Sequence, residues 1–282
     1  MTDLYAVVGN PISHSKSPLI HRLFAEQTQQ DMAYEAICID TDDTTFAWAM
    51  ADLRHRGYKG VNVTVPFKLD AFEYATQLTA RAQTAQAVNT LLFNADGTSL
   101  GDNTDGVGLV NDIELNAKRL FKEQSVLILG AGGAVQGVLE PILNKQPGLV
   151  HIANRTDSRA NALMQRFNTP TTLSASGWDD IPAHPFDIII NGTSASLEGK
   201  IPPITDQVIG KNSLVYDMMY GQQPTVFMDW AKRAQPTCQA LDGLGMLVGQ
   251  AAEAFYVWRG VRPNMTEVIA EVRAQMAKTS TP

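Results

Sequence analysis

Polar and charged side chains gather in four short segments of the first 106 residues, each at the end of a predicted strand. These segments are residues 9–18, 61–68, 87–90 and 101–106. Among them, Lys68 closely follows Pro66, and Asp105 stands at a predicted helix start. A lysine can donate a hydrogen bond or a proton to a developing alkoxide, and a neighbouring carboxylate can hold that lysine in place. Lys68 and Asp105 are therefore the pair of side chains here whose types could carry acid–base chemistry, and the sequence does not assign the proton to either one.

Both members of this pair also have ordinary structural explanations. Lys68 could be a surface lysine at a helix start, although its position just behind a strand end favours a functional role. Asp105 suits the N-cap of the helix that it begins, and capping is compatible with catalysis, so both explanations stay open. His14 lies in the first polar segment, and we interpret it as a loop residue rather than as an acid or base.

A glycine-rich turn between a predicted strand and a predicted helix indicates a phosphate site. The strand covers residues 125–129, the helix covers about 134–144, and the turn consists of Gly130, Ala131, Gly132, Gly133 and Ala134. Glycines let the backbone approach a pyrophosphate, and the free N–H groups at the start of the helix can bind it. The match to the dinucleotide-binding pattern is imperfect, because Val135 occupies the third position. A tight turn without a ligand is the alternative, and the strand–helix context disfavours it.

The residues after the next predicted strand, 150–153, favour NADP over NAD. NAD sites usually place an acidic residue there, about 20 residues beyond the glycines, to bind the ribose 2′-hydroxyl. This chain instead has Arg155 and Arg159, whose guanidinium groups match a 2′-phosphate in charge and geometry. Asp157, the nearest carboxylate, is interpreted as a helix-start residue. Two solvated arginines at a helix start are the structural alternative.

Taken together, these segments resemble the shikimate dehydrogenase family. The resemblance continues through residues 154–156, 216–220 and 242–250, and it covers nearly the whole chain in the family's order. It implies NADP-dependent reduction of 3-dehydroshikimate to shikimate, a step towards chorismate and the aromatic amino acids. It also implies hydride transfer from the cofactor to the substrate with acid–base assistance from Lys68 and Asp105.

The resemblance implies a role for each residue of the site. The hydroxyl groups of Ser15 and Ser17 would hold the substrate carboxylate. The rest of the substrate would contact Thr64, Lys68, Asn89, Asp105, Tyr220 and Gln250. The cofactor would contact the glycine turn and Asn154, Arg155, Thr156, Asp157, Ser158, Arg159, Met218 and Gly243. Short polar side chains suit a small polyhydroxylated acid, because a site group left unpaired penalises analogues that lack a hydroxyl.

Some of these residues allow ordinary explanations, and others depart from the family pattern. The ordinary explanations are loop or cap positions at Ser15 and Ser17, a loop-backbone partner at Asn89 and an exposed helix position at Gln250. Ala80 stands where the family often has an acidic residue before Arg81, so the resemblance does not extend a cofactor contact to this position. Gly249, inside a predicted helix, should cost roughly 1 kcal/mol of helix stability relative to alanine.

The elements that must position these residues alternate between strand and helix. Predicted strands cover residues 5–8, 34–39, 60–65, 125–129 and 150–153, with a hairpin of 88–93 and 99–102. Predicted helices cover residues 17–28, 44–56, 105–120, 134–144, 243–259 and 265–276, and further βα segments lie at 157–167, 186–191 and 213–217. This alternation predicts an α/β protein with parallel sheets. We expect a discontinuous N-terminal substrate domain, 1–106 plus 241–282, and a Rossmann-like, doubly wound NADP-binding domain, 107–240.

The composition is that of a globular protein and excludes several classes of function. Hydrophobic residues make up 44% of the 282 residues and charged residues 18%. The formal net charge of -7 argues against nucleic acid as a partner. The two cysteines show neither metal-ligand spacing nor a disulfide framework, and no membrane span or signal peptide is evident. We expect a cytoplasmic monomer or homodimer that acts on a small molecule without a metal.

Two other functions compete with this interpretation. A quinate or quinate/shikimate dehydrogenase would share the architecture, but the two serines and the paired arginines favour shikimate and NADP. A non-catalytic redox sensor could keep the glycine turn, yet it would have no need of Lys68 and Asp105. Steady-state kinetics with both acids and both cofactors would distinguish these possibilities.

Overall fold

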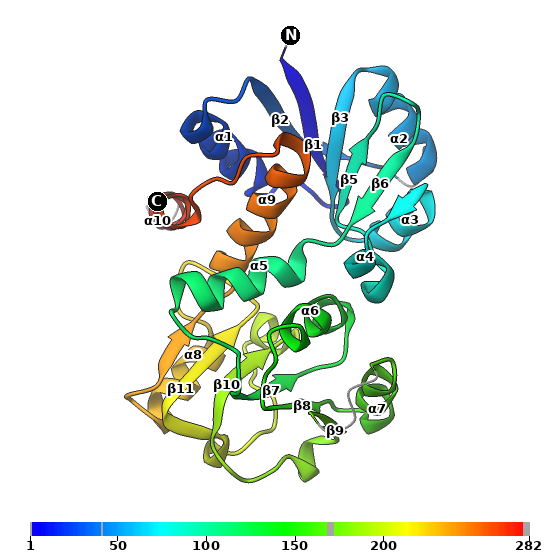
Figure 1. The fold of residues 1–282 in the computed structure, drawn as a ribbon. Coiled ribbons are helices and arrows are strands. Elements are labelled where there is room, and N and C mark those ends of the chain that lie inside the picture. The colour runs from blue at the N-terminus through cyan, green and yellow to red at the C-terminus, as the bar shows by residue number, and fades with distance from the viewer. Residues whose placement is uncertain (1, 41, 168–171, 279–282) are drawn as a thin grey trace. The chain divides into compact units, whose positions relative to one another are not determined.

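The computed structural model describes residues 2–40, 42–167 and 172–278, which form two compact units. The discontinuous unit comprises Met1–Gly108 and Leu247–Pro282, and the central unit comprises Leu109–Met246. Both boundaries lie inside helices, namely α5 (Asp105–Asn111) and α9 (Leu244–Arg259) (Figure 1). The chain therefore passes between the units within regular structure, a little later in sequence than the expected boundaries at residues 106 and 240.

The discontinuous unit is built on a mixed six-stranded sheet with the order β2-β1-β3-β5-β6-β4. Its strands are β1 (Asp3–Gly9), β2 (Met32–Cys38), β3 (Tyr58–Val63), β4 (Gln77–Leu78), β5 (Thr90–Phe93) and β6 (Ser99–Asp102). Strand β1 pairs in parallel with β2 and β3, whereas the β5–β6 hairpin adds to β3 in the antiparallel sense. The ends of β1, β3 and β6 and the start of β5 consequently meet at one edge of the sheet.

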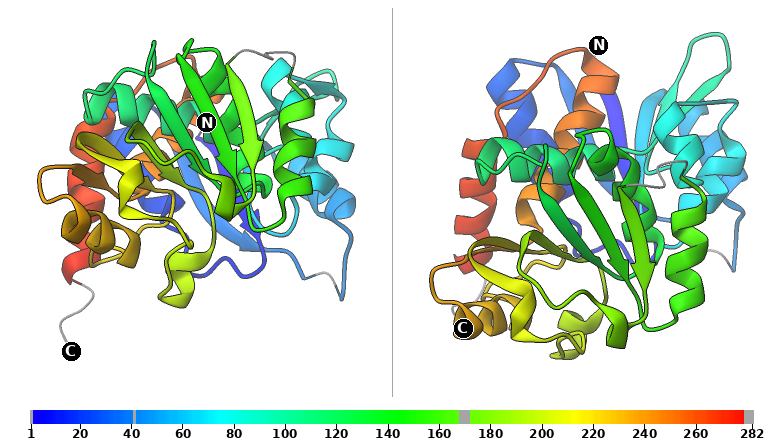
Figure 2. Two further views of the ribbon diagram at one scale, coloured as in Figure 1. Left: turned by 90° about the horizontal axis from the view of Figure 1, so that it is seen from below. Right: turned by 60° about the horizontal axis from the view of Figure 1, so that its bottom comes forward.

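Helices cover this sheet on both faces. They are α1 (Ser17–Thr28), α2 (Phe46–His55), α3 (Lys68–Tyr74), α4 (Ala80–Ala85), α9 and α10 (Met265–Lys278). On one face Phe46, Met50 and Ala71 pack against the valines of β1 and β3. On the other face, α1 and α9 meet through aromatic side chains, with the Phe24 and Phe255 ring centroids 5.7 Å apart. Helix α10 lies beside α1 (Figure 2), where Gln27 hydrogen bonds to Glu267 and to the backbone of Asn264.

The central unit contains a fully parallel six-stranded sheet with the order β12-β11-β10-β7-β8-β9. Its strands are β7 (Ser125–Leu129), β8 (Leu149–Ala153), β9 (Leu173–Ser176), β10 (Phe186–Asn191), β11 (Ile209–Asp217) and β12 (Gln239–Leu241). Alternate strand residues enter two separate cores, one on each face of the sheet. Helices α6 (Gly133–Leu143) and α7 (Asp157–Gln165) pack on one face, and α8 (Val226–Ala234) packs on the other. This is the doubly wound order that was expected, with its reversal point between β7 and β10.

The helix predicted for residues 105–120 is wrong in its second half. The α-helix ends at Asn111 and is followed by one π-helical segment, Asp112–Asn116. The Ala117 N–H reaches back to the carbonyl of Asp112, and Lys118 adopts a left-handed conformation with φ 56. The buried Asp112 carboxylate accepts a hydrogen bond from the Tyr216 hydroxyl at 2.7 Å. A tertiary partner, which local periodicity cannot reveal, thus accompanies the change of helix type.

Close packing explains Gly249, for which the sequence offered no function. A Cβ atom at this position would lie 2.7 Å from the carbonyl oxygen of Gly108 in α5. The two linking helices therefore touch backbone to backbone, and only glycine permits this distance without a shift.

No helix in the part of the chain that the structure describes is long and apolar enough to cross a membrane.

Candidate active site

Lys68 and Asp105 form an ion pair in the discontinuous unit. Lys68 is the first residue of α3, just beyond the end of β3, and Asp105 is the first residue of α5, just beyond β6. The Lys68 Nζ atom lies 2.6 Å from Asp105 Oδ2, with side-chain exposures of 33% and 17%. A charge-assisted bond of this length fixes the ammonium group while leaving part of it accessible. The structure therefore brings together the two side chains that the sequence predicted as a pair.

Asp105 is held from behind by two asparagines rather than used as a helix cap. Its backbone N–H is bound by the Asn103 side chain, and its Oδ1 atom accepts a hydrogen bond from Asn89 Nδ2 at 2.8 Å. The Gly108 N–H is bound by the Thr104 carbonyl. Because both carboxylate oxygens are bound by Asn89 and Lys68, the N-cap interpretation of the Asp105 side chain is not needed.

Asn89 connects Asp105 with Gln250 of α9. The buried Asn89 amide nitrogen lies 3.4 Å from Gln250 Oε1, and its oxygen accepts a hydrogen bond from the Thr104 N–H at 2.9 Å. Gln250 in turn donates to the carbonyl of Leu247 at 2.9 Å. Asn89 therefore supports the loop backbone, as its ordinary explanation requires, and also contacts two further predicted substrate residues. Gln250 is not a freely exposed helix position.

The predicted carboxylate-binding hydroxyls lie together at the start of α1. Ser17 is 7% exposed, and its N–H donates to the Ser15 hydroxyl oxygen at 3.3 Å. Burial raises the pKa of Tyr34 well above its usual value, while a hydrogen bond with Ser17 acts in the opposite direction. Thr64, at the end of β3, packs against Gly9 at the end of β1, where a Cβ atom would collide with its methyl group. Thr64 and Gly9 thus lie at the strand ends that the sequence predicted, and the two serines follow at the start of α1.

A buried histidine behind these groups was not noticed in the sequence. His21 stacks on Tyr34 with ring centroids 4.1 Å apart, and its Nε2 atom lies 3.2 Å from Asn62 Oδ1. Asn62 also accepts from the Tyr34 hydroxyl at 2.7 Å and donates to the Asn89 carbonyl at 3.3 Å. Burial lowers the pKa of His21 to about 3, despite its bond with Asn62, so the ring is neutral at physiological pH. Its sequence signal was hidden because His21 falls in the middle of an amphipathic helix pattern.

In the central unit, the glycine turn links β7 to α6 at the reversal point of the sheet. Gly130 has φ 108, a left-handed conformation that favours glycine, and its neighbour across the turn is the backbone of Gly192. Gly132 is the N-cap of α6, and a Cβ atom at Gly132 or Gly133 would meet nothing within 4 Å. The first turn of α6 contains no acidic side chain. These features fit a bound pyrophosphate, because the backbone N–H groups are approachable and no negative charge competes.

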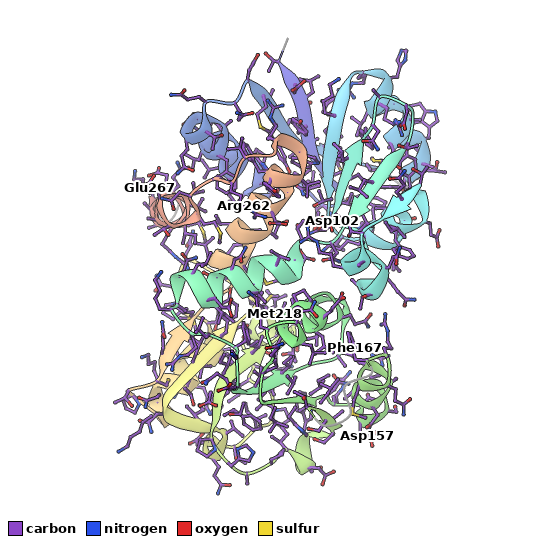
Figure 3. The ribbon with its side chains drawn as sticks, in the orientation of Figure 1. Asp102, Asp157, Phe167, Met218, Arg262 and Glu267 are labelled. Atoms are coloured by element: carbon purple, nitrogen blue, oxygen red, sulfur yellow. The ribbon has the colours of Figure 1, made fainter. Side chains whose placement is uncertain are left out.

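The residues after β8 present two arginines to solvent. Arg155 and Arg159 are exposed, and neither guanidinium has a hydrogen-bond partner among residues 2–40, 42–167 and 172–278. Asp157, labelled in Figure 3, begins α7 and accepts from the Ser158 N–H at 2.6 Å, in agreement with its interpretation as a helix-start residue. Asn154 donates to the Thr156 carbonyl at 2.9 Å, which orders the turn between them. The charge and placement of the arginines fit a 2′-phosphate.

Asp217, at the end of β11 beside β10, is a buried carboxylate to which the sequence analysis assigned no role. Asp217 Oδ1 accepts from Asn191 at 3.1 Å and from the Met219 N–H at 3.1 Å, and Oδ2 accepts from Ser196 at 2.6 Å. Burial raises the pKa of Asp217, although these hydrogen bonds oppose the rise. Asp217 directly precedes Met218, whose N–H binds the Asn191 carbonyl at 2.9 Å. Its position at the end of a strand beside β10 was the available signal.

Met218 and Gly243 are brought together at the same edge of the central sheet. A Cβ atom at Gly243 would overlap the Met218 carbonyl, and one at Gly192 would approach the Met218 sulfur to 3.1 Å. Tyr220 also belongs to the central unit and is 37% exposed. The other predicted substrate residues belong to the discontinuous unit, so contact between Tyr220 and the substrate stays a prediction.

The amino-acid sequence is similar to known proteins over nearly the whole chain. Residues 7–91 match the model of the shikimate dehydrogenase substrate binding domain. Residues 114–230 match that of shikimate / quinate 5-dehydrogenase, and residues 243–273 that of the shikimate 5′-dehydrogenase C-terminal domain. The chain is 69% identical over 273 residues to shikimate dehydrogenase (NADP(+)) of Hydrogenovibrio crunogenus, covering 97% of this chain and 98% of that protein.

Solved structures show the same likeness. The Ael1 enzyme from Pseudomonas putida superposes with a TM-score of 0.91 at 44% identity, covering 96% of this chain and 98% of that one. Shikimate 5-dehydrogenase from Thermus thermophilus, in complex with NADP(H) and shikimate, gives a TM-score of 0.84 at 28% identity. That likeness covers 98% of this chain and 100% of the other.

Proposed function

The chain belongs to the shikimate dehydrogenase family, and from that premise we propose that Lys68 and Asp105 carry the chemical step of its reaction. It is an NADP-dependent oxidoreductase that interconverts 3-dehydroshikimate and shikimate on the route to aromatic amino acids. The observation that supports the residue assignment is the 2.6 Å contact between Lys68 Nζ and Asp105 Oδ2 at the sheet edge where the other polar side chains gather.

The ion pair suits reduction of a ketone. The bound cofactor supplies the hydride, and the substrate carbonyl oxygen becomes an alkoxide. Lys68 donates a hydrogen bond to that oxygen and provides a proton, which stabilises the negative charge where it develops. Asp105 holds the ammonium group from the opposite side through its Oδ2 atom. In the reverse direction, the same pair receives the proton of the hydroxyl that is oxidised.

The remaining polar side chains of the discontinuous unit suit the rest of the substrate. Ser15 and Ser17 hold its carboxylate, and Thr64, Asn89 and Gln250 bind its ring hydroxyls. Asn89 is buried and already bound on both amide atoms, so it approaches a substrate hydroxyl in a fixed orientation. Fixed partners of this kind discriminate strongly against a molecule that lacks a hydroxyl.

The central unit would hold the cofactor. The glycine turn and the start of α6 would bind the pyrophosphate, and Arg155 and Arg159 would bind the 2′-phosphate with Asn154, Thr156, Asp157 and Ser158 beside them. Met218 and Gly243 would line the nicotinamide ring. The discontinuous unit is thus the substrate domain, and the central unit is the cofactor domain.

An absorbance assay of nicotinamide reduction tests this assignment. With shikimate and NADP, wild-type chain should turn over, and Lys68→Met should lower kcat about 1,000-fold with KM changed little, since the lysine acts mainly in the transition state. Lys59→Met, which removes an exposed lysine on β3, is the matched control and should behave as wild type. Unchanged turnover in Lys68→Met would exclude the lysine from the chemistry.

Quinate is the closest alternative substrate, because one matching family model covers shikimate and quinate together. Quinate carries an additional ring hydroxyl and lacks the double bond. Assays with both acids and both cofactors should show the highest kcat/KM for shikimate with NADP. A comparable kcat/KM for quinate with NAD would contradict the proposed specificity.

We also propose that the protein works in the cytoplasm, as a monomer or homodimer, without a nucleic-acid partner. The net charge of -7 and the sparse cysteines support this proposal. Sedimentation equilibrium at micromolar concentration would distinguish monomer from dimer, and a larger assembly would contradict both.

A further inference from the structure

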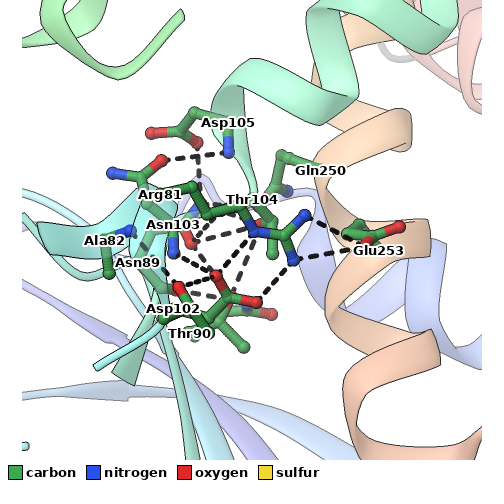
Figure 4. Close-up of polar contacts among 12 residues, drawn as sticks. Arg81, Ala82, Asn89, Thr90, Asp102, Asn103, Thr104, Asp105, Gln250 and Glu253 are labelled. Atoms are coloured by element: carbon green, nitrogen blue, oxygen red, sulfur yellow. Dashed lines mark hydrogen bonds and ion pairs between the residues drawn. The ribbon is translucent and has the colours of Figure 1, made fainter. Parts of the chain in front are cut away.

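A second charged network lies behind the Lys68–Asp105 pair. Arg81 of α4 binds Asp102 through two parallel hydrogen bonds, Nε to Oδ1 at 2.7 Å and Nη2 to Oδ2 at 2.5 Å. The same guanidinium binds Glu253 Oε1 of α9 at 3.1 Å through both Nη1 and Nη2. Figure 4 shows Arg81 between the two carboxylates. Arg262 completes the network from the solvent side, with Nη1 2.8 Å from Glu253 Oε2.

One end of this network supports the residues that hold Asp105. The Asp102 carbonyl binds the Asn89 N–H at 3.0 Å, and Asp102 Oδ1 binds the Asn103 N–H at 2.8 Å. Asn103 in turn binds the N–H of Asp105 at 3.2 Å. Asp102 therefore contacts Asn89 directly and reaches Asp105 through Asn103. At 2% exposure of its side chain, it has little freedom to move.

The other end of the network supports Gln250. Glu253 lies three residues after Gln250 in α9, so the two side chains occupy the same face of the helix. The Glu253 side chain is only 8% exposed. Arg81 thus connects the β6 end, which carries Asp105, to the helix that carries Gln250. These two elements provide hydroxyl-binding groups of the proposed site.

Stability alone is a weak reason for such a network. A buried ion pair often contributes no more than apolar residues of the same volume, because removing charges from water is costly. The pKa of Arg81 shows how closely the groups are matched: burial lowers it, but the hydrogen bonds and charges of Asp102 and Glu253 outweigh burial and raise it overall. A planar guanidinium with fixed donors defines distances and angles between the elements that it joins.

We propose that Arg81 is a positioning residue that sets the separation between Gln250 and the Asn89–Asp105 pair, and thereby the enzyme's selectivity for the ring hydroxyls of its substrate. This inference rests on the proposed function. Arg81 touches neither substrate nor cofactor in this scheme. It acts through Asp102 and Glu253.

The test compares Arg81→Gln with Arg259→Gln. Arg259 forms an ion pair with Asp3 near the end of α9, so its loss removes a comparable tie between that helix and the sheet, outside the site. Both variants should lower the unfolding temperature. Arg81→Gln alone should raise the KM for shikimate about tenfold, leave the KM for NADP within about twofold, and reduce about tenfold the preference for shikimate over an analogue lacking one ring hydroxyl.

Arg81→Lys provides a second variant should the glutamine variant not fold. It keeps the charge but loses the planar fork, so its KM for shikimate should lie between those of wild type and the glutamine variant. An unchanged KM for shikimate and unchanged selectivity in a folded Arg81 variant would overturn the inference, as would equal changes in Arg259→Gln. Failure of wild-type protein to oxidise shikimate would instead contradict the proposed function itself.

Discussion

Four of the predicted substrate residues contact one another, whereas the two arginines predicted to bind the cofactor stand apart and face solvent. Asn89 joins Asp105 to Gln250 through hydrogen bonds, and Asp105 binds Lys68. In the central unit, by contrast, the Arg155 and Arg159 side chains are exposed. Other groups predicted to bind the cofactor there are the glycines and backbone N–H groups of the turn at residues 130–134. The difference indicates two modes of recognition, one by oriented side chains and one by charge and backbone.

This contrast has a physical reason in the two ligands. A small polyhydroxylated acid offers neutral hydroxyl groups, and a site can distinguish them only through hydrogen-bonding groups that are already oriented. The substrate site must therefore be rigid before the substrate binds. A phosphate is recognised by charge from several directions, and long arginine side chains can adapt to it. Contacts in the first region should therefore be strongly coupled, and contacts in the second should be nearly independent.

The largest effect should come from the pair itself. Lys68→Met and Asp105→Asn should each lower kcat by about 1,000-fold, and the double variant should be no worse than the poorer single variant, because the two residues act as one unit. Steady-state kinetics of the four proteins check this. Losses that multiply in the double variant would show that the two side chains act separately.

The arginines should show the opposite behaviour with a smaller effect. Arg155→Gln and Arg159→Gln should each raise the KM for NADP about tenfold, and the double variant should be poorer than either single variant, because each guanidinium binds the phosphate without relying on a bond to the other. The KM for NAD, which lacks the 2′-phosphate, should stay the same and serves as the internal control. Equal increases for NAD and NADP would mean that these side chains do not bind the 2′-phosphate.

Gly249→Ala should destabilise the protein, although alanine favours helices. The gain of about 1 kcal/mol in helix propensity should be exceeded by overpacking against Gly108, leaving a net loss of about 1–3 kcal/mol in the free energy of unfolding. Urea denaturation followed by far-ultraviolet circular dichroism measures this. An unchanged or increased midpoint would mean that α5 and α9 can separate without cost.

The smallest effect concerns acid stability of the discontinuous unit. Burial lowers the pKa of His21 from 6.5 to about 3, so between these two values the histidine is protonated in the unfolded chain but neutral in the folded one. This histidine therefore does not affect the free energy of unfolding above pH 6.5, and it lowers that free energy as the pH falls from 6.5 towards 3. Between pH 6.5 and 5.5 the loss should be about 1 kcal/mol. The wild-type free energy of unfolding should decline more steeply in this range than that of His21→Gln, and equal slopes would contradict the assignment.

Sequence patterns located most of the long elements, because these depend on local signals. Strand ends, glycines and helix starts drew attention to Lys68, Asp105 and the turn at residues 130–134, and the family resemblance supplied the roles that stay predictions for them. The alternation of strand and helix predicted a parallel sheet in the central unit, but not its strand order. Hydrophobic periodicity reports which face of an element is buried, and this was sufficient for long, regular segments.

The parts that sequence could not predict depend on contacts between distant residues. Arg81 and Glu253 are 172 positions apart, and no local pattern indicates that they form a pair. The change from α- to π-helix at Asp112 accompanies a hydrogen bond from Tyr216, 104 positions away. Short elements such as β4 and α4 were missed because segments of two and six residues show no clear hydrophobic period.

The discontinuous unit has a consequence for synthesis on the ribosome. Its sheet is made first, but α9 and α10 emerge only after the whole central unit. The sheet and helix α1 lack several partners until then: the Trp258 indole binds the Leu91 carbonyl at 3.0 Å, and Phe255 packs on Phe24. The central unit, which is contiguous, can fold before these contacts are available. The substrate-binding part of the nascent enzyme is therefore begun first and completed last.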